Sequence, residues 1–414
     1  MKIALNVKLV KFAKLFKGSR LYAVGGFVRN SLLGAACTDI DLAGSLKIEE
    51  IKKLVEGTEF VCEEKSKLLG TALIKCENFV WEYSTFRKEI YENGGAHSPV
   101  KVEFCDSVQE DSKRRDFTMN SVYLDILKGE LLDFNNGIYD IKKRIVKAIG
   151  DPAEVFSHDG VRILRMIRQS SELGFKIDGK TFIAANMFGA NLDEISGERK
   201  KCELLQILNS PEKYEGFSKK KSHIYGLNLI SSLRLWKYFY LPIEKVKFKI
   251  VKKAEPENRF IAFCVDVFNE AKPRDRELFL NNFLGGDGLK FPSAFTVKST
   301  NIILGYIDAL NYLNNKDYFF NYFNNFEIIR EIIKKNNKKV FKKYNFFYKY
   351  LLNNKVAIQI KDLSIKGSDI KNKYPKIPAK RFGFILNELL SKVFDGEISN
   401  EKNKLLKEVE KYDY

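Results

Sequence analysis

Short apolar runs separated by charged and turn-forming residues fill the first part of the chain, and this pattern predicts mixed α/β structure. Segments with β-rich or alternating composition predict strands at RLYAVGG, DIDLAGS, TALIKC, FVWEYSTFR and VKVEFC. Only a few polar residues separate TALIKC from FVWEYSTFR, which predicts a hairpin. The amphipathic segment IEEIKKLVEG predicts a helix ending at Gly57, and GELLDFNNGIYDIKKRIVKAIGDP predicts turns before a last extended run.

From Ala153 onward the apolar positions follow the helical period. GVRILRMIRQSSELGF predicts a helix, and ISGERKKCELLQILNS predicts another that starts at a capping serine. Helical segments dominate the remainder, and no repeat of the solenoid type is present in the sequence. Beyond about Asn301 the sequence consists mainly of Lys, Asn, Phe and Tyr, residues that are suited to contacting RNA backbone and bases. AT-rich codons alone would produce the same bias.

The composition indicates a polyanionic binding partner and argues against a zinc site. The formal net charge of +18 favours nucleic acid as that partner. The six cysteines are scattered without a CxxC pair, which argues against a zinc site and fits reduced thiols in a cytosol. Lysines interrupt the N-terminal segment, and no long uncharged run follows. We therefore expect a soluble cytoplasmic protein with no membrane partner, and its 414 residues predict several domains.

Asp39 and Asp41 lie one residue apart in the predicted strand DIDLAGS. Strand alternation places both carboxylates on one face, where they repel each other unless a cation lies between them. Mg²⁺ prefers carboxylate and phosphate oxygens, and two such ions would clamp a triphosphate and activate an attacking hydroxyl. Such a pair is a weak signal when it stands alone, because many surface turns contain one.

A glycine pair and an arginine precede these aspartates. Gly25 and Gly26 permit a close approach of the backbone to phosphate, and Arg29 is able to pair with phosphate oxygens. No GKS or GKT follows, and no GxGxxG is present, so the segment matches neither a Walker A loop nor a Rossmann turn.

Four blocks in fixed order identify a family resemblance. They read GGFVRNSLLGAACTDIDLA, RRDFTMNSVYLDI, GDPAEVFSHDGVRILRMIRQSSELGF and ISGERKKCELLQIL, and together they span Leu21 to Leu208. These blocks resemble the signature of the class II tRNA nucleotidyltransferases and bacterial poly(A) polymerases. The resemblance implies an α+β chain with a polymerase β-like palm head (1–147), followed by an all-α neck (148–212), body (213–310) and basic, tRNA-binding tail (311–414).

The resemblance also implies roles for residues of the head. Asp39 and Asp41 would bind catalytic Mg²⁺, and Glu82 is our candidate for a third carboxylate, with an ordinary strand-surface glutamate as the alternative. Gly26 and Arg29 would contact the incoming nucleotide. Arg115 would help to hold the phosphates of this nucleotide. Asp116 would orient the sugar or the contact between head and neck, and the alternative is an internal ion pair with a neighbouring arginine.

Asp159 and Arg162 are three residues apart on a predicted helix and therefore neighbours on its surface. Cytosine and adenine both offer an amino donor beside a ring-nitrogen acceptor, which match a carboxylate and a guanidinium, whereas uracil and guanine present the opposite order. The resemblance assigns base selection to this pair. The alternative is a local salt bridge with no role in recognition. Arg165 and Arg168 match further nucleotide-binding positions, but helix geometry places Arg168 on the far side from Asp159.

The chain departs from the family pattern at several positions. Asn30 stands where the family has Asp, His158 where it has Glu, and Gly160 where proline is common. The segment YENGGAHSPVKVEF lacks the arginine and aspartate of a flexible loop that the family ties to switching from C to A addition. His158 beside Asp159 suggests pH-sensitive recognition.

These observations predict a template-independent CCA-adding tRNA nucleotidyltransferase that uses CTP and ATP and releases pyrophosphate. A CC-adding enzyme, an A-adding enzyme and a poly(A) polymerase remain alternatives with the same chemistry. A non-catalytic RNA-binding protein is an alternative of a different class, and the intact Asp39 and Asp41 pair argues against it.

Overall fold

The structure is a computed structural model that describes residues 3–37, 39–91, 99–214, 219–286, 288–311, 322, 325–353 and 356–412. Close contacts divide the chain into two compact units. The first unit comprises Met1–Val246 with Asp287–Lys290, and the second comprises Lys247–Gly286 with Phe291–Tyr414. The expected division into head, neck, body and tail stays a prediction.

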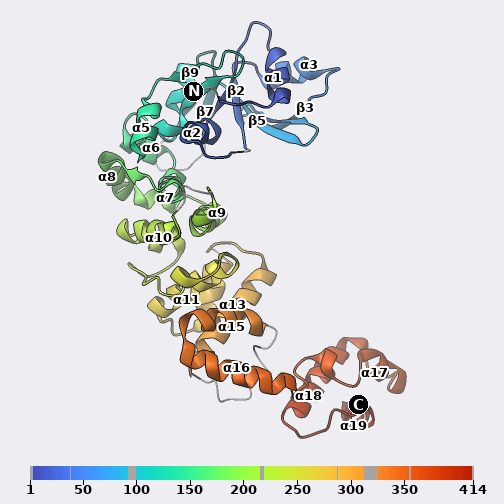
Figure 1. The fold of residues 1–414 in the computed structure, drawn as a ribbon. Coiled ribbons are helices and arrows are strands. Elements are labelled where there is room, and N and C mark those ends of the chain that lie inside the picture. Colours follow the sequence, from blue (N-terminus) through green and yellow to red (C-terminus); the bar gives the residue numbers. More distant parts are fainter. Residues whose placement is uncertain are drawn as a thin grey trace. The chain divides into compact units, whose positions relative to one another are not determined.

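The N-terminal part of the first unit contains a seven-stranded sheet (Figure 1). Its strand order is β3-β4-β5-β2-β1-β8-β9. All neighbouring strands are antiparallel except β2 and β5, which run parallel. Two small two-stranded sheets, β6-β7 and β10-β11, accompany it. The strands are β1 (Leu21–Val24), β2 (Asp41–Gly44), β3 (Val61–Ser66), β4 (Thr71–Cys76), β5 (Phe79–Thr85), β6 (Arg87–Ile90), β7 (Lys101–Phe104), β8 (Val122–Asp125), β9 (Leu131–Asp133), β10 (Ile145–Val146) and β11 (Lys176–Ile177).

The predicted strands RLYAVGG, TALIKC, FVWEYSTFR and VKVEFC are confirmed as β1, β4, β5 and β7. The predicted hairpin is confirmed too, with Cys76 paired to Phe79 at its end. The prediction for DIDLAGS was wrong at its start. Strand β2 begins at Asp41, because its ladder with β1 ends at the pair Val24 and Asp41, and Asp39 lies before the strand.

The segment expected to form turns contains a helix, α5 (Gly137–Lys143). A Cβ at Gly137 would lie 2.2 Å from the Thr118 carbonyl oxygen, so the helix packs very closely on the 3₁₀ turn Thr118–Asn120. This tertiary contact, rather than local helix propensity, explains why the turn-rich sequence is helical.

Helices of the first unit cover the sheet and continue beyond it, as Figure 1 shows for the blue to green part of the chain. The predicted helices in IEEIKKLVEG, GVRILRMIRQSSELGF and ISGERKKCELLQILNS are confirmed as α3, α7 and α9, and the Ser196 side chain caps α9. The helices are α1 (Val7–Lys14), α2 (Gly26–Leu33), α3 (Ile48–Val55), α4 (Val108–Lys113), α5, α6 (Pro152–His158), α7 (Val161–Leu173), α8 (Gly179–Met187), α9 (Gly197–Leu208) and α10 (Ser222–Ser232).

The described residues of the second unit form helices joined by loops and contain no strand, as the sequence predicted. Its last part has an apolar core of its own, formed by residues between Ala357 and Val409. Every helix in the described ranges is too short or too polar to cross a membrane. The helices are α11 (Arg259–Ala271), α12 (Arg276–Leu284), α13 (Ser293–Asn311), α15 (Phe326–Asn336), α16 (Lys338–Asn353), α17 (Gly367–Lys373), α18 (Phe382–Phe394) and α19 (Lys402–Val409).

Candidate active-site cleft

Carboxylates meet where β2 and β5 run side by side. Asp41 at the start of β2 is the register partner of Glu82 in β5, so the two side chains lie on one face of the sheet. Asp39 lies just ahead of β2 and acts electrostatically on Asp41. The carboxylate of Glu82 accepts a hydrogen bond from Lys65 Nζ at 2.7 Å. The three acidic candidates are thus brought to one edge, although the described residues contain no ready-made group of three metal-ligating side chains.

Asp41 is in a setting that favours a cation. Desolvation raises the pKa of its carboxyl, Glu82 and Asp39 raise it further, and Arg115 and Arg165 oppose them. Like charges that raise a carboxyl pKa are relieved when a metal ion binds between them. The donor set consists of carboxylate oxygens, the ligands preferred by hard divalent cations. These residues therefore fit a divalent cation of that kind.

The N-terminus of α2 lies against Asp41. Gly25 has φ of 75°, and a Cβ there would lie 3.1 Å from Asp41 Oδ2. Helix α2 begins at Gly26 without a capping side chain, so the first N–H groups are left for another partner. A helix N-terminus of this kind suits an anion such as phosphate, and the cation-binding carboxylates lie beside it.

Arg29 is almost fully buried, with 4% of its surface exposed, and its five N–H groups donate to protein acceptors. Asn30 Oδ1 accepts two of these bonds at 3.0 and 2.9 Å. Asn120 Oδ1 accepts one at 2.8 Å, and Gln169 and Tyr214 accept the others. All of these acceptors are neutral. Arg29 would have to release one of these bonds to hold a phosphate.

Asp159 and Arg162 lie together at the junction of α6 and α7. Asp159 is extended and precedes α7, so the prediction that it lies on the helix was wrong. Its Oδ1 accepts from the Val161 N–H at 3.0 Å, and its Oδ2 lies 3.8 Å from Arg162 Nε. The helix N-terminus attracts the carboxylate into this capping position.

One stripe of α7 joins this pair to the head. Arg162 donates to the Arg114 carbonyl at 3.1 Å, and Arg165 forms an ion pair with Asp116 at 2.6 Å. Gln169 then accepts from Arg29 and Asn120.

Of the two alternatives for Asp116, the structure contains the ion pair, and this pair is also a contact between α7 and the head. Arg168 points away from the head, as helix geometry predicted, and donates to Glu203 of α9 at 2.7 Å.

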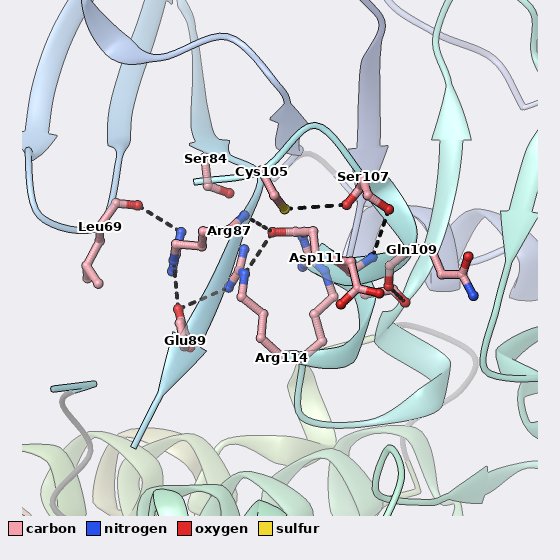
Figure 2. Close-up of polar contacts among 12 residues, drawn as sticks. Leu69, Ser84, Arg87, Glu89, Cys105, Ser107, Gln109, Asp111 and Arg114 are labelled. Atoms are coloured by element: carbon pink, nitrogen blue, oxygen red, sulfur yellow. Dashed lines mark hydrogen bonds and ion pairs between the residues drawn. The ribbon is translucent and has the colours of Figure 1, made fainter. Parts of the chain in front are cut away.

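A buried ion cluster lies beside the acidic edge, and sequence reasoning missed it. Figure 2 shows the guanidinium groups of Arg87 and Arg114 both directed at Glu89. Asp111 accepts from the Arg114 guanidinium and from the Arg87 backbone N–H. Asp111 Oδ2 also accepts from Arg115 at 3.3 Å and from the Tyr123 hydroxyl. The signal was present in the alternation R-x-E at the start of β6, which places both charges on one face of the strand.

A cleft of about 570 Å³ connects these groups within the first unit. Its lining includes Glu82 near the acidic edge, Arg115 and Asp116 from the head, and residues of the α6–α7 junction: Asp159, Arg162 and Arg165. Tyr91, another residue that the sequence did not single out, also lines it. The predicted site residues outside this lining are Gly26, Arg29, Asp39, Asp41 and Arg168. Of the three acidic candidates, Glu82 alone is part of the lining.

The structure explains two of the departures from the family pattern. A Cβ at Gly160 would lie 2.4 Å from the Asn191 carbonyl oxygen, so a larger residue would displace the start of α7. The His158 ring stacks on Tyr91 at 5.0 Å, and burial, then Arg162, lowers the pKa of His158. The altered loop residues 92–98 lie outside the described residues.

Comparison with known proteins identifies related sequences and folds. A family model described as poly A polymerase head domain matches residues 21–147, and one described as tRNA nucleotidyltransferase domain 2, putative, matches residues 288–409. A CCA-adding enzyme of Ligilactobacillus salivarius is 30% identical over 412 residues, covering 95% of this chain and 93% of the relative. A CCA-adding enzyme of Streptococcus mutans is 39% identical over 195 residues, or 47% of each chain.

The fold is also shared with a solved structure. The Bacillus stearothermophilus CCA-adding enzyme, crystallised in complex with CTP, superposes with a TM-score of 0.71 and 22% identity. The match covers 98% of this chain and 96% of that one.

The neutral hydrogen-bond acceptors around Arg29 lead to a prediction about the free energy of unfolding. Asn30 is fully buried, and its Nδ2 has no hydrogen-bond partner. In Asn30→Asp, an oxygen replaces this orphaned donor and a counter-charge is added beside the guanidinium. We expect the free energy of unfolding of the first unit to rise by about 1–3 kcal/mol, as measured by urea denaturation.

Asn120→Asp is the matched control, because it adds the same charge beside Arg29. The Asn120 amide nitrogen donates to Asp116 and Gln169, so this change places two carboxylates together and should destabilise the unit. Equal effects of the two substitutions would contradict the assignment.

Proposed function

The chain belongs to the family of CCA-adding enzymes, and we propose that it adds C and A from CTP and ATP to the 3′ end of tRNA without a nucleic-acid template. The tRNA 3′-oxygen forms a bond to the α-phosphorus of the nucleotide, the bond to pyrophosphate breaks, and the hydroxyl proton is released. The observation that carries the proposal is the single cleft, because it joins the acidic edge at Glu82 to Asp159 and Arg162. We also propose a cytoplasmic location, which the free thiols of all six cysteines support.

Asp39 and Asp41 would hold Mg²⁺, with Glu82 as a candidate third carboxylate. The register of Glu82 opposite Asp41 supports this choice, and its ion pair with Lys65 would have to open. When bound, the metal supplies charge neutralisation for the triphosphate and a lower pKa for the attacking hydroxyl.

The protein's own groups bind the triphosphate beside this edge. The uncapped N-terminus of α2 at Gly26 would donate backbone N–H groups to phosphate oxygens. Arg115 lines the cleft and presents positive charge near Asp41, while Asp111 and Tyr123 fix its guanidinium. Arg29 contributes by holding α2 to Asn120 and Gln169, so we assign it a positioning role rather than a direct bond to phosphate.

Asp159 and Arg162 would select the base. The Asp159 carboxylate accepts from the amino group of cytosine or adenine, and Arg162 donates to the adjacent ring nitrogen. Uracil and guanine would leave both protein groups without matched partners. Arg165 lines the same cleft, paired with Asp116, and is a further candidate contact to the nucleotide. Arg168 is engaged with Glu203, so its assignment as a nucleotide ligand has no support from its contacts.

Helix α16 supplies a candidate tRNA-binding surface on the second unit. Within the described residues its lysines form no ion pairs, so their charge remains available for phosphate. Phe346 and Tyr350 are 68% and 54% exposed and are suited to stacking on bases. The exposed positions of α16 are Lys338, Lys339, Lys342, Lys343, Phe346, Lys349, Tyr350 and Asn353.

An end-series assay tests the reaction. Purified protein is incubated with tRNAs that lack A, CA or CCA, each with CTP and ATP, and the products are sequenced. We expect completion of CCA in every case and no further extension. A long A-tail would identify a poly(A) polymerase, and a product that stops at CC or grows only by A would identify the partial enzymes.

Asp39→Ala and Asp41→Ala should each lower the rate at least about 1,000-fold in this assay, because the metal-binding carboxylates are lost. Asp193→Ala is the matched control, since Asp193 is an exposed aspartate that follows the 3₁₀ turn Gly189–Leu192 and belongs to neither β2 nor β5. Unchanged incorporation in both active-site variants would refute the catalytic assignment.

The pH dependence of base selection tests Asp159. Burial raises the pKa of its carboxyl to about 6, against the opposing effect of Arg162. The ionised acceptor is therefore lost as the pH falls through about 6, and a protonated carboxyl donates to the uracil carbonyl instead. The ratio of kcat/KM for CTP to that for UTP should be constant above about pH 7 and fall below 6. The same midpoint in His158→Asn would assign the titration to Asp159, and a flat ratio would contradict it.

The surface on α16 is tested by tRNA binding. Phe346→Ala should weaken the affinity for tRNA about tenfold, since base stacking on an aromatic ring is lost. Phe384→Ala on α18 is the control, because Phe384 is similarly exposed but lies on a different helix. The measurement is filter binding at fixed salt. Equal effects of the two substitutions would exclude a specific role for α16.

A further inference from the structure

Strand β6 directs alternate side chains toward the cleft. Arg87 and Glu89 lie on its inner face, and Tyr91, which follows the strand, continues the same alternation. Lys88 and Ile90 lie on the exposed face. The Tyr91 hydroxyl donates to Glu89 Oε2 at 2.6 Å, which links the tyrosine to the ion cluster of Figure 2.

Two arginines hold the Glu89 carboxylate in place. Arg87 Nε donates to Glu89 Oε1 at 2.7 Å, and Arg114 lies 3.5 Å from the same oxygen. These two arginines lower the pKa of Glu89 despite its burial, and burial together with Glu89 raises the pKa of the Tyr91 phenol. Tyr91 therefore remains a hydrogen-bond donor to an ionised acceptor throughout the neutral pH range.

The Tyr91 ring contacts the base-selecting junction. The His158 ring lies parallel to it, with 9° between the planes and 5.0 Å between centroids. The guanidinium carbon of Arg162 lies 5.8 Å from the Tyr91 centroid, within the range of a cation–π interaction. Tyr91, Arg162 and Asp159 line the same cleft.

The Arg162 side chain needs a support such as the Tyr91 ring. Its ion pair with Asp159 spans 3.8 Å, too long for a hydrogen bond, and one N–H donates to the Arg114 carbonyl. A long side chain held at few points retains several rotamers. A rigid ring beside the guanidinium limits these rotamers at low entropic cost.

We propose that Tyr91, anchored by Glu89, is a positioning residue that fixes the Arg162 guanidinium and thereby determines nucleotide selectivity. The inference rests on the proposed function, because selectivity has meaning only if nucleotides are added. Tyr91 acts through Arg162 and not on the reacting phosphate. Its loss therefore changes which base is accepted and how tightly, while the chemical step at the acidic edge continues.

The test compares substitutions of Tyr91 in the full-length protein, with a tRNA that lacks CCA as the acceptor. Tyr91→Leu removes the ring, and Tyr91→Phe removes only the hydroxyl. Tyr139→Leu is the matched control, since Tyr139 of α5 also lies beside a cation, Lys143 at 5.7 Å, but is outside the cleft lining. Single-turnover rates and KM are measured separately for CTP and UTP, and the melting temperature is recorded for each variant.

In Tyr91→Leu the ratio of kcat/KM for CTP to that for UTP should fall about tenfold, mainly through a higher KM for CTP. The single-turnover rate at saturating CTP should change less than about threefold. Tyr91→Phe should retain most of the selectivity because its ring remains, and Tyr139→Leu should leave both quantities unchanged. If Tyr91→Leu melts below the assay temperature, Tyr91→Met replaces it, since Met fills similar space without a π face.

An unchanged CTP to UTP ratio in Tyr91→Leu or Tyr91→Met would overturn the inference. Equal losses of rate for both nucleotides would also overturn it, because they would indicate a purely structural role. Failure of the wild-type protein to add any nucleotide would instead refute the proposed function, so the two failures are distinguishable.

Discussion

The polar contacts between one stripe of α7 and the head are the constraint on which the site depends. In the proposed function, a nucleotide would place its triphosphate at one end of the cleft and its base at the other, so both ends would have to be held at a fixed separation. Arg162, Arg165 and Gln169 are spaced to lie on one face of α7, and they contact successive parts of the head. These contacts set the position of Asp159 and Arg162, the proposed base-selecting pair, relative to the acidic edge.

The arginines in these contacts differ in whether a carboxylate neutralises their charge. Asp116 neutralises Arg165, and Asp111 and Glu89 neutralise the arginines of the cluster in Figure 2. Arg29 makes the same number of bonds as its guanidinium has N–H groups, and the side chains that accept these bonds are all neutral. A buried cation without a carboxylate partner is costly, and a nearby anionic ligand would reduce that cost.

The ends of strands and helices bring the groups of the two proposed roles into one unit: Glu82, the register partner of Asp41, lines the same cleft as Asp159 and Arg162. The pairing of β1 with β2 ends at Val24 and Asp41. Gly25 follows Val24 and leads into α2, whose N-terminus has no side-chain cap. Strand β6 directs Glu89 and Tyr91 toward the start of α7. Each local feature is ordinary, and their combination in one unit produces a site able to bind phosphate, metal and base together.

The sequence by itself determined the family, the main elements and most candidate residues, because motif order and hydrophobic period are local properties of the chain. Asp41, Glu82 and Asp159 were identified from pattern and resemblance alone. Only the tertiary structure decided that all N–H groups of the Arg29 guanidinium donate to protein acceptors and that the Tyr91 ring lies beside the Arg162 guanidinium. Arg29 and Gln169 are far apart in sequence, as are Tyr91 and Arg162, so no local pattern records these contacts. The balance of their hydrogen bonds and charges exists only once the chain has folded.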